Sequence, residues 1–400
     1  MSAETVRLTV GAPAHGGHCV ARDEGRVVFV RHAIPGEVVD AVLTDAEPKA
    51  KFWRAEAVAV VEKSPDRVES AWPEAGPGGV GGGELAHVSL PAQREWKLTV
   101  LREAFERFAG TEFTGGVAAA PGDDDREGLR YRTRVTATAA ADGRPAMAKF
   151  RSHDLVALES MPLAVESAEE ALIGARYPHG ETIAVAAPAG GDARVLVGGK
   201  PWRKGGVDKR DNAPATVRET VTVGDQTFEY RVATGGFWQV HREAPGVLVG
   251  EVLARVGDGE RVLDLYAGAG LFTLPLAAAG RTVVSVEADD VAARNAVRNL
   301  HGHEQVDIFS GDVRRALKEG LGTFDAVVLD PPRSGAGKFT LEQVATTGAS
   351  RLVYVACDPV ALARDVSYLD DLGYSLDSVA GHDLFPMTHH VEAVASFSLR

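Results

Sequence analysis

The last third of the chain carries four near-continuous apolar runs, at residues 261–266, 282–287, 324–330 and 351–356. Helical patterns lie between them. Strands that are apolar throughout are typical of a parallel sheet that is buried on both faces and connected by helical crossovers. The pattern therefore predicts a doubly wound, Rossmann-like α/β domain. Ligands of such sheets bind beyond the carboxyl ends of the strands.

The first 62 residues show short strand signals instead, at residues 6–10, 27–30, 37–42 and 55–61. Turn signals separate them at short, regular intervals, which predicts a small antiparallel β-barrel. Barrels of this kind bind oligonucleotides in some proteins and are packing modules in others. The pattern alone leaves both interpretations open.

The middle of the chain begins with a Gly- and Pro-rich loop at residues 64–83. Apolar residues at three- and four-residue spacing then predict a helix at about residues 91–109. Mixed strand signals and a helix near residues 168–172 follow. We predict three domains: a β-barrel at 1–62, a mixed α+β central domain at 63–233 with the helix of 91–109 packed on the catalytic domain, and the α/β catalytic domain at 234–400.

Composition narrows the function classes. The 400 residues include two cysteines, Cys19 and Cys357, which excludes a disulfide scaffold and any metal site built from three or four thiolates. A formal net charge of −13 argues against a wholly basic nucleic-acid coat and an anionic-membrane binder, but allows a local basic groove. Because no targeting signal or membrane-spanning apolar run is apparent, we expect a cytoplasmic protein.

A candidate nucleoside pocket follows the first apolar run. Gly268 and Gly270 would allow a ligand to approach the backbone closely at a helix N-terminus. Glu287 ends the next strand and could hold two ribose hydroxyls, and Asp312 could receive an adenine amino group. Thr273 replaces the third glycine of a dinucleotide fingerprint, which favours S-adenosylmethionine over NAD. An ordinary strand–helix turn with solvent-exposed acids is the alternative.

Two further strand ends provide a candidate reacting centre. Asp330 is followed by two prolines, which would form a rigid wall beside a flat ligand or merely end the strand. Cys357 precedes Asp358 and Pro359, a pair that predicts an immediate helix start. A thiol at a helix N-terminus is pushed toward thiolate, so Cys357 is a candidate nucleophile. The alternative is an inert buried thiol.

Near residue 390, two histidines and a glutamate suggest a metal at first sight. His389 faces the opposite side of an extended chain from His390 and Glu392, so we predict no metal site there. A general base is the better interpretation of Glu392, and a solvated surface acid is the alternative.

Together these residues resemble the RNA uracil-5-methyltransferases, which convert uridine to 5-methyluridine in transfer or ribosomal RNA. The motifs Asp-Pro-Pro-Arg, Ala-Cys-Asp-Pro and His-Val-Glu occur in this order at residues 330–333, 356–359 and 390–392. Residues 16–39 resemble the family's TRAM barrel, which is similar to an OB-fold and contacts RNA. Residues 236–241 resemble its Phe-x-Gln-Val-Asn segment. The resemblance covers nearly the whole chain.

The resemblance implies a class I methyltransferase sheet, a central domain that faces RNA, and S-adenosylmethionine as methyl donor. It implies that Cys357 adds to carbon 6 of uracil, that carbon 5 takes the methyl group, and that Glu392 removes the carbon 5 proton. The target uridine would have to leave its stack. The implied cofactor-binding residues are Gln239, Tyr266, Gly268, Gly270, Glu287, Asp312 and Asp330.

The sequence departs from the family at several positions. Many members hold a four-iron cluster with four cysteines, but residues 72–83 and Met161 stand in the matching places, so we predict no iron–sulfur cluster. Leu271 replaces the family's asparagine after Gly-x-Gly. His241 replaces the asparagine of Gln-Val-Asn. One cofactor contact would thereby be lost or rerouted.

Several alternatives stay open. The chain could be an RNA-binding protein of this architecture without catalysis, or a cytosine-5 RNA methyltransferase; Thr273 argues against an NAD oxidoreductase. Arg-rich stretches at residues 126–134 and 200–210 could contact RNA phosphates or be solvated surface. We expect a monomer whose partner is transfer or ribosomal RNA, and the sequence does not identify the nucleotide.

Overall fold

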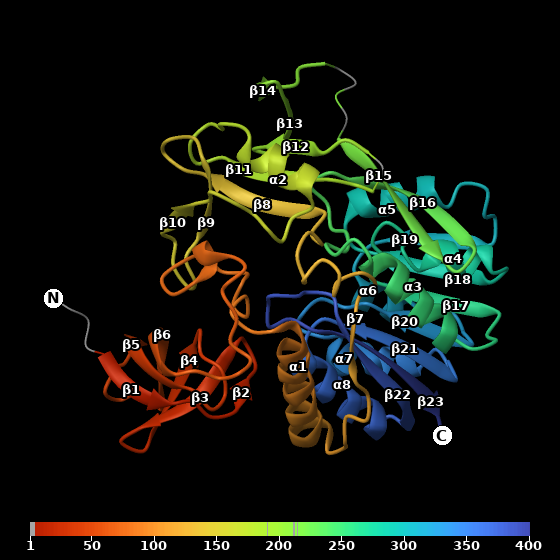
Figure 1. Ribbon diagram of the computed structural model, residues 1–400. Helices are drawn as coiled ribbons and strands as arrows, with labels where there is room; N and C mark the ends of the chain where they lie inside the picture. The colour runs from red at the N-terminus through yellow and green to blue at the C-terminus, as the bar shows by residue number, and fades with distance from the viewer. Residues whose placement is uncertain (1–4, 190, 211–212, 214) are drawn as a thin grey trace.

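The computed structural model describes residues 5–189, 191–210, 213 and 215–400. Its strands form sheets of six, seven, two and eight strands (Figure 1). The six-stranded sheet comes from the N-terminal part of the chain, the seven-stranded sheet from the middle, and the eight-stranded sheet almost entirely from the last third. No helix in the described part of the chain is long and apolar enough to cross a membrane.

The N-terminal sheet has the order β1-β5-β6-β4-β3-β2. Alternate residues point inward and form a core that includes Leu8, Cys19, Val28 and Val39. The predicted barrel strands are thus present, with one difference: β4 and β6 pair in parallel. The strands are β1 (Thr5–Thr9), β2 (Pro13–Ala14), β3 (His18–Asp23), β4 (Arg26–Arg31), β5 (Val38–Asp45) and β6 (Phe52–Glu62).

The middle sheet is antiparallel and has the order β10-β9-β8-β11-β12-β13-β14. Helix α2 (Glu166–Ile173), close to the predicted position, buries Ala168 and Leu172 in its core. The strands are β8 (Arg134–Ala139), β9 (Pro145–Ala148), β10 (Leu155–Ala157), β11 (Thr182–Ala186), β12 (Arg194–Val197), β13 (Lys200–Arg203) and β14 (Gly206–Val207).

The eight-stranded sheet of the predicted catalytic domain, called the catalytic sheet below, has the order β19-β18-β17-β20-β21-β23-β22-β7. Its first five members pair in parallel, which confirms the doubly wound α/β fold, and β23 pairs antiparallel to β21 and β22. The strands are β7 (Val117–Ala119), β17 (Arg261–Leu265), β18 (Thr282–Glu287), β19 (Val306–Ser310), β20 (Ala326–Leu329), β21 (Arg351–Ala356), β22 (Tyr374–Asp383) and β23 (Glu392–Leu399).

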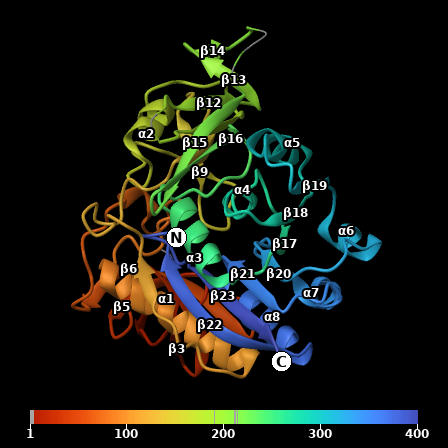
Figure 2. The same ribbon diagram turned by 90° about the vertical axis from the view of Figure 1, so that its right-hand side faces the viewer.

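Helices cover both faces of this sheet, as the second view lets the reader follow (Figure 2). One face carries α6 (Val313–Glu319), α7 (Gly337–Ala345) and α8 (Pro359–Asp371). The other carries α3 (Ala244–Arg255), α4 (Thr273–Ala278) and α5 (Asp290–Asn299). Because strand order reverses between β17 and β20, a crevice for ligands is expected at their carboxyl ends.

The hairpin β15 (Thr216–Val223) and β16 (Gln226–Ala233) lies within the predicted central domain. Its buried side chains, however, share one core with α3 and β17 of the catalytic domain. The domain boundary after residue 233 remains a prediction, and we propose to count this hairpin with the catalytic domain.

Helix α1 (Leu90–Ala104) continues into a π-helical turn at Phe105–Ala109, over the span where a helix was predicted. Leu101 and Phe105 are buried in the core of the catalytic sheet. Trp96 and Val100, on another side of the helix, are buried in the core of the barrel. Helix α1 thus packs against two domains at once, as its place in Figure 1 shows.

Candidate functional site

A cavity of about 540 Å³ opens at the carboxyl ends of the catalytic strands. This volume lies within the range of small-molecule and cofactor sites. It brings together seven of the nine residues that the sequence suggested, from six separate segments of the chain. They are Gln239, Tyr266, Gly268, Glu287, Asp330, Cys357 and Glu392.

The pairing of β21 with β23 places the two candidate catalytic residues side by side. The last pair of the ladder is Ala356 with Ala393. The next residue on each strand toward the cavity is Cys357 on one and Glu392 on the other. Strand register therefore accounts for the meeting of a thiol and a carboxyl group that are 35 positions apart in the sequence.

Cys357 lies directly before the N-cap of α8. Asp358 is that cap: its Oδ1 accepts the N–H of Ala361 at 2.8 Å, and Pro359 begins the helix, as predicted. The other oxygen of Asp358 lies 3.1 Å from Nε2 of His15, which comes from the barrel. The barrel thus contacts the residue next to the thiol.

The sequence predicted a thiolate at Cys357, and this prediction is wrong for the structure without ligands. Burial, and then the charges of Glu392 and Asp330, raise the pKa of this thiol to about 12, while Arg333 acts in the opposite direction. The position at a helix N-terminus does not outweigh burial together with two nearby carboxyl groups. The thiol is therefore neutral until something changes the charge around it.

The two acids beside Cys357 are themselves perturbed. Burial raises the pKa of Asp330 to about 7, with a contribution from Asp264. Burial and the charge of Asp330 raise the pKa of Glu392 well above its ordinary value. A carboxyl group poised in this way can hold a proton at neutral pH and release it when a positive charge approaches.

The glycine turn and Glu287 are locked together. Glu287 Oε2 accepts the N–H of Gly268 at 2.7 Å, and Oε1 accepts the N–H of Asp289 at 2.6 Å. Tyr266 has a φ of 65°, in the left-handed region that a bulky side chain rarely adopts. Such strain persists where the surroundings enforce it, often at functional sites. Here it lies at the cavity wall.

The structure places Gly270 and Asp312 outside the residues that line the cavity. Gly270 has a φ of 91°, which favours glycine, and its N–H closes the turn onto the carbonyl of Ala267. Asp312 caps α6 by accepting the N–H of Arg315 at 3.0 Å. Both residues have structural roles here, and their contacts with a cofactor remain predictions.

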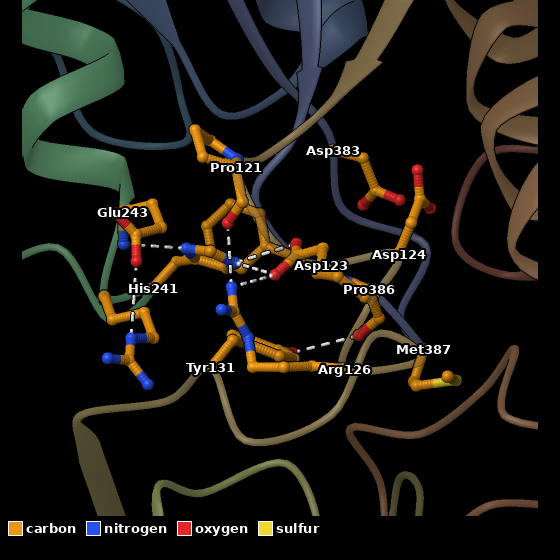
Figure 3. A network of polar contacts seen from close by, with 12 residues as sticks. Pro121, Asp123, Asp124, Arg126, Tyr131, His241, Glu243, Asp383, Pro386 and Met387 are labelled. Atoms are coloured by element: carbon orange, nitrogen blue, oxygen red, sulfur yellow. Dashed lines mark hydrogen bonds and ion pairs between the residues drawn. The ribbon is translucent and has the colours of Figure 1, made fainter.

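The position of His241 explains the departure from Gln-Val-Asn. Its Nδ1 accepts the N–H of Glu243 at 3.0 Å, so Nε2 carries the proton and donates to Asp123 at 2.9 Å. The ring stacks on Tyr131, whose hydroxyl donates to the carbonyl of Pro386 (Figure 3). His241 is therefore part of a buried network, whereas Gln239 reaches the cavity.

Leu271, the second departure, is buried in the apolar core, and its carbonyl accepts the hydroxyl of Tyr230 at 2.9 Å. Thr273 donates to Asp264 Oδ2 at 2.6 Å. Neither side chain lines the cavity, so both residues serve the scaffold of the turn.

The region where the resembling family holds its iron–sulfur cluster has apolar packing here. Trp72, Ala75, Val80 and Met161 are buried in one core cluster. Cys19 is buried in the barrel. In the described part of the chain, no group of three His, Cys, Asp or Glu residues could hold a metal. The residues present do not fit a cluster.

Sequence reasoning missed the residues that hold the loop before Glu392. Lys97 on α1 is fully buried, pairs with Asp383 and donates to the carbonyl of Phe385 at 3.0 Å. Gln93 donates to two backbone carbonyls and accepts the N–H of Met387 at 2.7 Å. The four-residue spacing of Gln93, Lys97 and Leu101 on a buried helix face was a signal that could have identified them.

Arg333 was also missed, although it belongs to the Asp-Pro-Pro-Arg motif. It lines the cavity, and its Nη2 lies 3.3 Å from Nε2 of His390. Burial and neighbouring cations lower the pKa of His390 to about 3, so the neutral ring accepts this hydrogen bond. A cation next to Cys357 is thereby held in place.

These features fit S-adenosylmethionine. A Cβ added at Gly268 would meet open space, so the turn leaves room for a ligand against the backbone. Glu287 supplies carboxylate oxygens near that turn, and Gln239 supplies an amide. The acids Asp330 and Glu392, whose pKa values are raised, can release a proton when a positive charge approaches and so complement a sulfonium.

Comparison with protein families gives three matches. The model described as "TRAM domain" matches residues 1–58. The model "tRNA (Uracil-5-)-methyltransferase" matches residues 316–398, and "TRM5/TYW2 methyltransferase domain" matches residues 250–347.

Individual relatives match nearly the full chain. An uncharacterized RNA methyltransferase of Bifidobacterium longum is 40% identical, over 96% of this chain and 94% of that protein. A 23S rRNA (uracil(1939)-C(5))-methyltransferase of Shewanella amazonensis is 30% identical, over 99% of this chain and 96% of that protein. The tRNA (uracil-54, C5)-methyltransferase of Pyrococcus abyssi, solved with S-adenosyl-L-homocysteine, has the same fold, with a TM-score of 0.73 and 21% identity over 98% of this chain and 100% of that chain.

Proposed function

Because the chain belongs to the RNA uracil-5-methyltransferase family, whose members use S-adenosylmethionine, we propose that it methylates carbon 5 of a uridine through Cys357. The observation that carries this proposal is the meeting of Cys357, Glu392 and Asp330 in one cavity. Carbon 5 of uracil is a weak nucleophile, so a reaction there needs a group that first activates the ring.

Cys357 is the activating group. Its thiolate adds to carbon 6, which breaks the 5,6 double bond and leaves an enolate whose nucleophilic atom is carbon 5. When bound, S-adenosylmethionine supplies an electrophilic methyl group and a positive charge that favours the thiolate of Cys357. Arg333, which already lowers the pKa of that thiol, acts in the same direction.

Glu392 completes the reaction. After methylation, carbon 5 carries both a methyl group and a proton. The carboxylate of Glu392 takes that proton, the 5,6 double bond re-forms, and the sulfur of Cys357 leaves as thiolate. The buried loop held by Lys97 positions Glu392 for this step. The cofactor would be bound by Gln239, Tyr266, Gly268 and Glu287. Asp330 would face the cofactor or the uracil ring.

We propose ribosomal RNA as the substrate, since relatives named as 23S rRNA uracil-5-methyltransferases are 30% and 32% identical over at least 98% of this chain. The test is deletion of the protein in its own organism, followed by mass spectrometry of nucleosides from separated ribosomal and transfer RNA. Loss of one 5-methyluridine from ribosomal RNA supports the proposal. Loss from transfer RNA alone would reassign the substrate, and loss of 5-methylcytidine would reassign the base. A cytoplasmic location and a monomeric state stay predictions.

A further inference from the structure

A second cavity, of about 410 Å³, lies between the barrel and the turn after β9. Its walls come from β3, β4, β5 and β6 of the barrel, from the glycines at 78–79, and from the turn at residues 149–154 of the central domain. None of the residues that line it lines the catalytic cavity. It is a separate site at a junction between two domains.

Four cationic side chains line this cavity: Arg31, Arg54, Lys149 and Arg151. Arg31 is the most buried of them, with 3% of its surface exposed. Its Nη1 donates to Glu56 at 3.1 Å, whereas its Nε and Nη2 find no hydrogen-bond partner in the described part of the chain. Buried guanidinium donors without partners are costly, so this geometry suits an anionic ligand.

Phe150 fixes the turn against the barrel. The guanidinium of Arg31 lies 3.6 Å from the centre of the Phe150 ring. The ring of His18 packs on the same ring, with 5.9 Å between the two ring centres. The next residue, Arg151, has a φ of 53°. This left-handed conformation is unfavourable for arginine. It places a second guanidinium 5.7 Å from the same ring.

The acids around the cavity pair with two of these four cations, Arg54 and Arg31. Asp45 pairs with Arg54 at 2.9 Å, and Glu56 accepts from both Arg31 and the N–H of Gly78. Among the residues that the structure describes, no carboxylate pairs with Lys149 or Arg151. Asp154 is the remaining acid of the lining. Burial lowers the pKa of Arg31, and the charges of Glu84 and Glu56 act in the opposite direction.

We propose that this cavity binds a backbone phosphate of the RNA substrate, with Arg31, Lys149 and Arg151 as its ligands. The proposal rests on the proposed function, because it assumes an RNA substrate. Two cations from the turn and one from the barrel surround the anion, which explains a positive site that lies apart from the chemistry. Phosphate contacts of this kind position a nucleic acid without reading its sequence.

The test uses Lys149→Ala/Arg151→Ala in the full-length protein, since both side chains are on the turn and their removal leaves Arg31 and Phe150 packed. Arg102→Ala/Arg107→Ala is the matched control. It removes the same charge from exposed positions of α1 and its π-helical turn, away from both cavities. The probe is fluorescein-labelled dodecauridylate, and Kd is measured by anisotropy at several salt concentrations.

We expect the cavity variant to bind the oligonucleotide roughly tenfold more weakly, with a salt slope that is shallower by about 0.7 for one lost phosphate contact. The control variant and the affinity for S-adenosylmethionine should match wild type. Equal Kd and slope in the two double variants would overturn the proposal. The proposal would also be overturned if the cavity variant lost binding to a labelled polyglutamate peptide as strongly as it lost binding to the oligonucleotide. That result would assign the cavity to acidic protein segments.

The failure of the proposed function would look different. Wild-type protein that transfers no labelled methyl group to total RNA, yet shows the difference between the two double variants, would retain the phosphate site and lose the enzymatic assignment. Normal methyl transfer with no such difference would remove the phosphate site alone.

Discussion

At the scale of the residue, the protonation of Cys357 is the feature that the sequence pattern predicted wrongly. A helix N-terminus was visible in the order Cys-Asp-Pro. The two acids from other strands were visible as well, but their distance from the sulfur was not. Since burial and like charge raise the pKa to about 12, the free protein holds a neutral thiol, and the proposed function requires bound ligands to lower this pKa.

Alkylation measures this directly. With a pKa of about 12, Cys357 should react with iodoacetamide at pH 8 about a thousandfold more slowly than an unperturbed thiol. The rate should rise with pH up to about 12. Peptide mass spectrometry locates the label, and Cys357→Ser controls for Cys19. Rapid labelling of Cys357 at pH 7 would contradict the assigned environment.

Glu392 offers a second test at this scale. In Glu392→Gln the amide cannot take the carbon 5 proton, so the methylated ring should stay attached to Cys357. We expect a covalent protein–RNA species that survives denaturing electrophoresis and is absent in Glu392→Gln/Cys357→Ala. Turnover of Glu392→Gln at the wild-type rate would exclude Glu392 as the base.

Asp264 makes stability depend on pH. It is fully buried, and burial raises its pKa from 3.8 to about 7. The unfolded chain releases this proton above about pH 4 while the native state retains it. The stabilising contribution is therefore complete below pH 4 and is lost as pH rises toward 7.

Asp264→Asn keeps an acceptor for Thr273 and removes the titration. Between pH 4 and 7, the slope of the unfolding free energy against pH, measured with urea, should be more positive in the variant than in wild type by roughly 1 kcal/mol per pH unit. Asp307→Asn, an exposed acid of the same sheet, should leave the slope unchanged. Identical slopes for Asp264→Asn and wild type would mean that Asp264 is ionised in the native state.

At the scale of the element, α1 and the loop before β23 act as one unit. The variant Lys97→Met leaves Asp383 buried and without its main partner, although Nε of Arg94 lies 3.8 Å from Oδ2 of Asp383. We expect a loss of about 3 to 5 kcal/mol in the free energy of unfolding, measured by chemical denaturation. Lys97→Met/Asp383→Asn should recover much of it. A single variant as stable as wild type would show that the pair does not hold the loop.

The elements differ in how far they could be predicted. The apolar strands β17, β18, β20 and β21 were predictable because they are buried on both faces and need no partner to be recognised. The short strands β2 and β14 and the parallel pairing of β4 with β6 depend on contacts between distant segments. The same applies to the packing of hairpin β15–β16 on the catalytic domain.

At the scale of the whole molecule, the catalytic cavity is supported from outside its own sheet. Helix α1 joins the barrel to the catalytic core, and His15 of the barrel contacts Asp358 beside the thiol. The motifs of the sequence predicted most of the residues that line the cavity, since strand ends of one sheet meet at one edge. They could not identify His15 or the second cavity, because these depend on the packing of domains.

The central claim is that Cys357 enables methyl transfer to carbon 5 of uracil. The direct measurement incubates wild type and Cys357→Ala with unmodified ribosomal RNA and labelled S-adenosylmethionine, digests the RNA, and quantifies labelled nucleosides by mass spectrometry. Cofactor affinity, measured by calorimetry, shows that the variant is folded. We expect 5-methyluridine from wild type and none from Cys357→Ala, with similar cofactor binding. Label in another nucleoside, or 5-methyluridine formed by Cys357→Ala at the wild-type rate, would contradict the account.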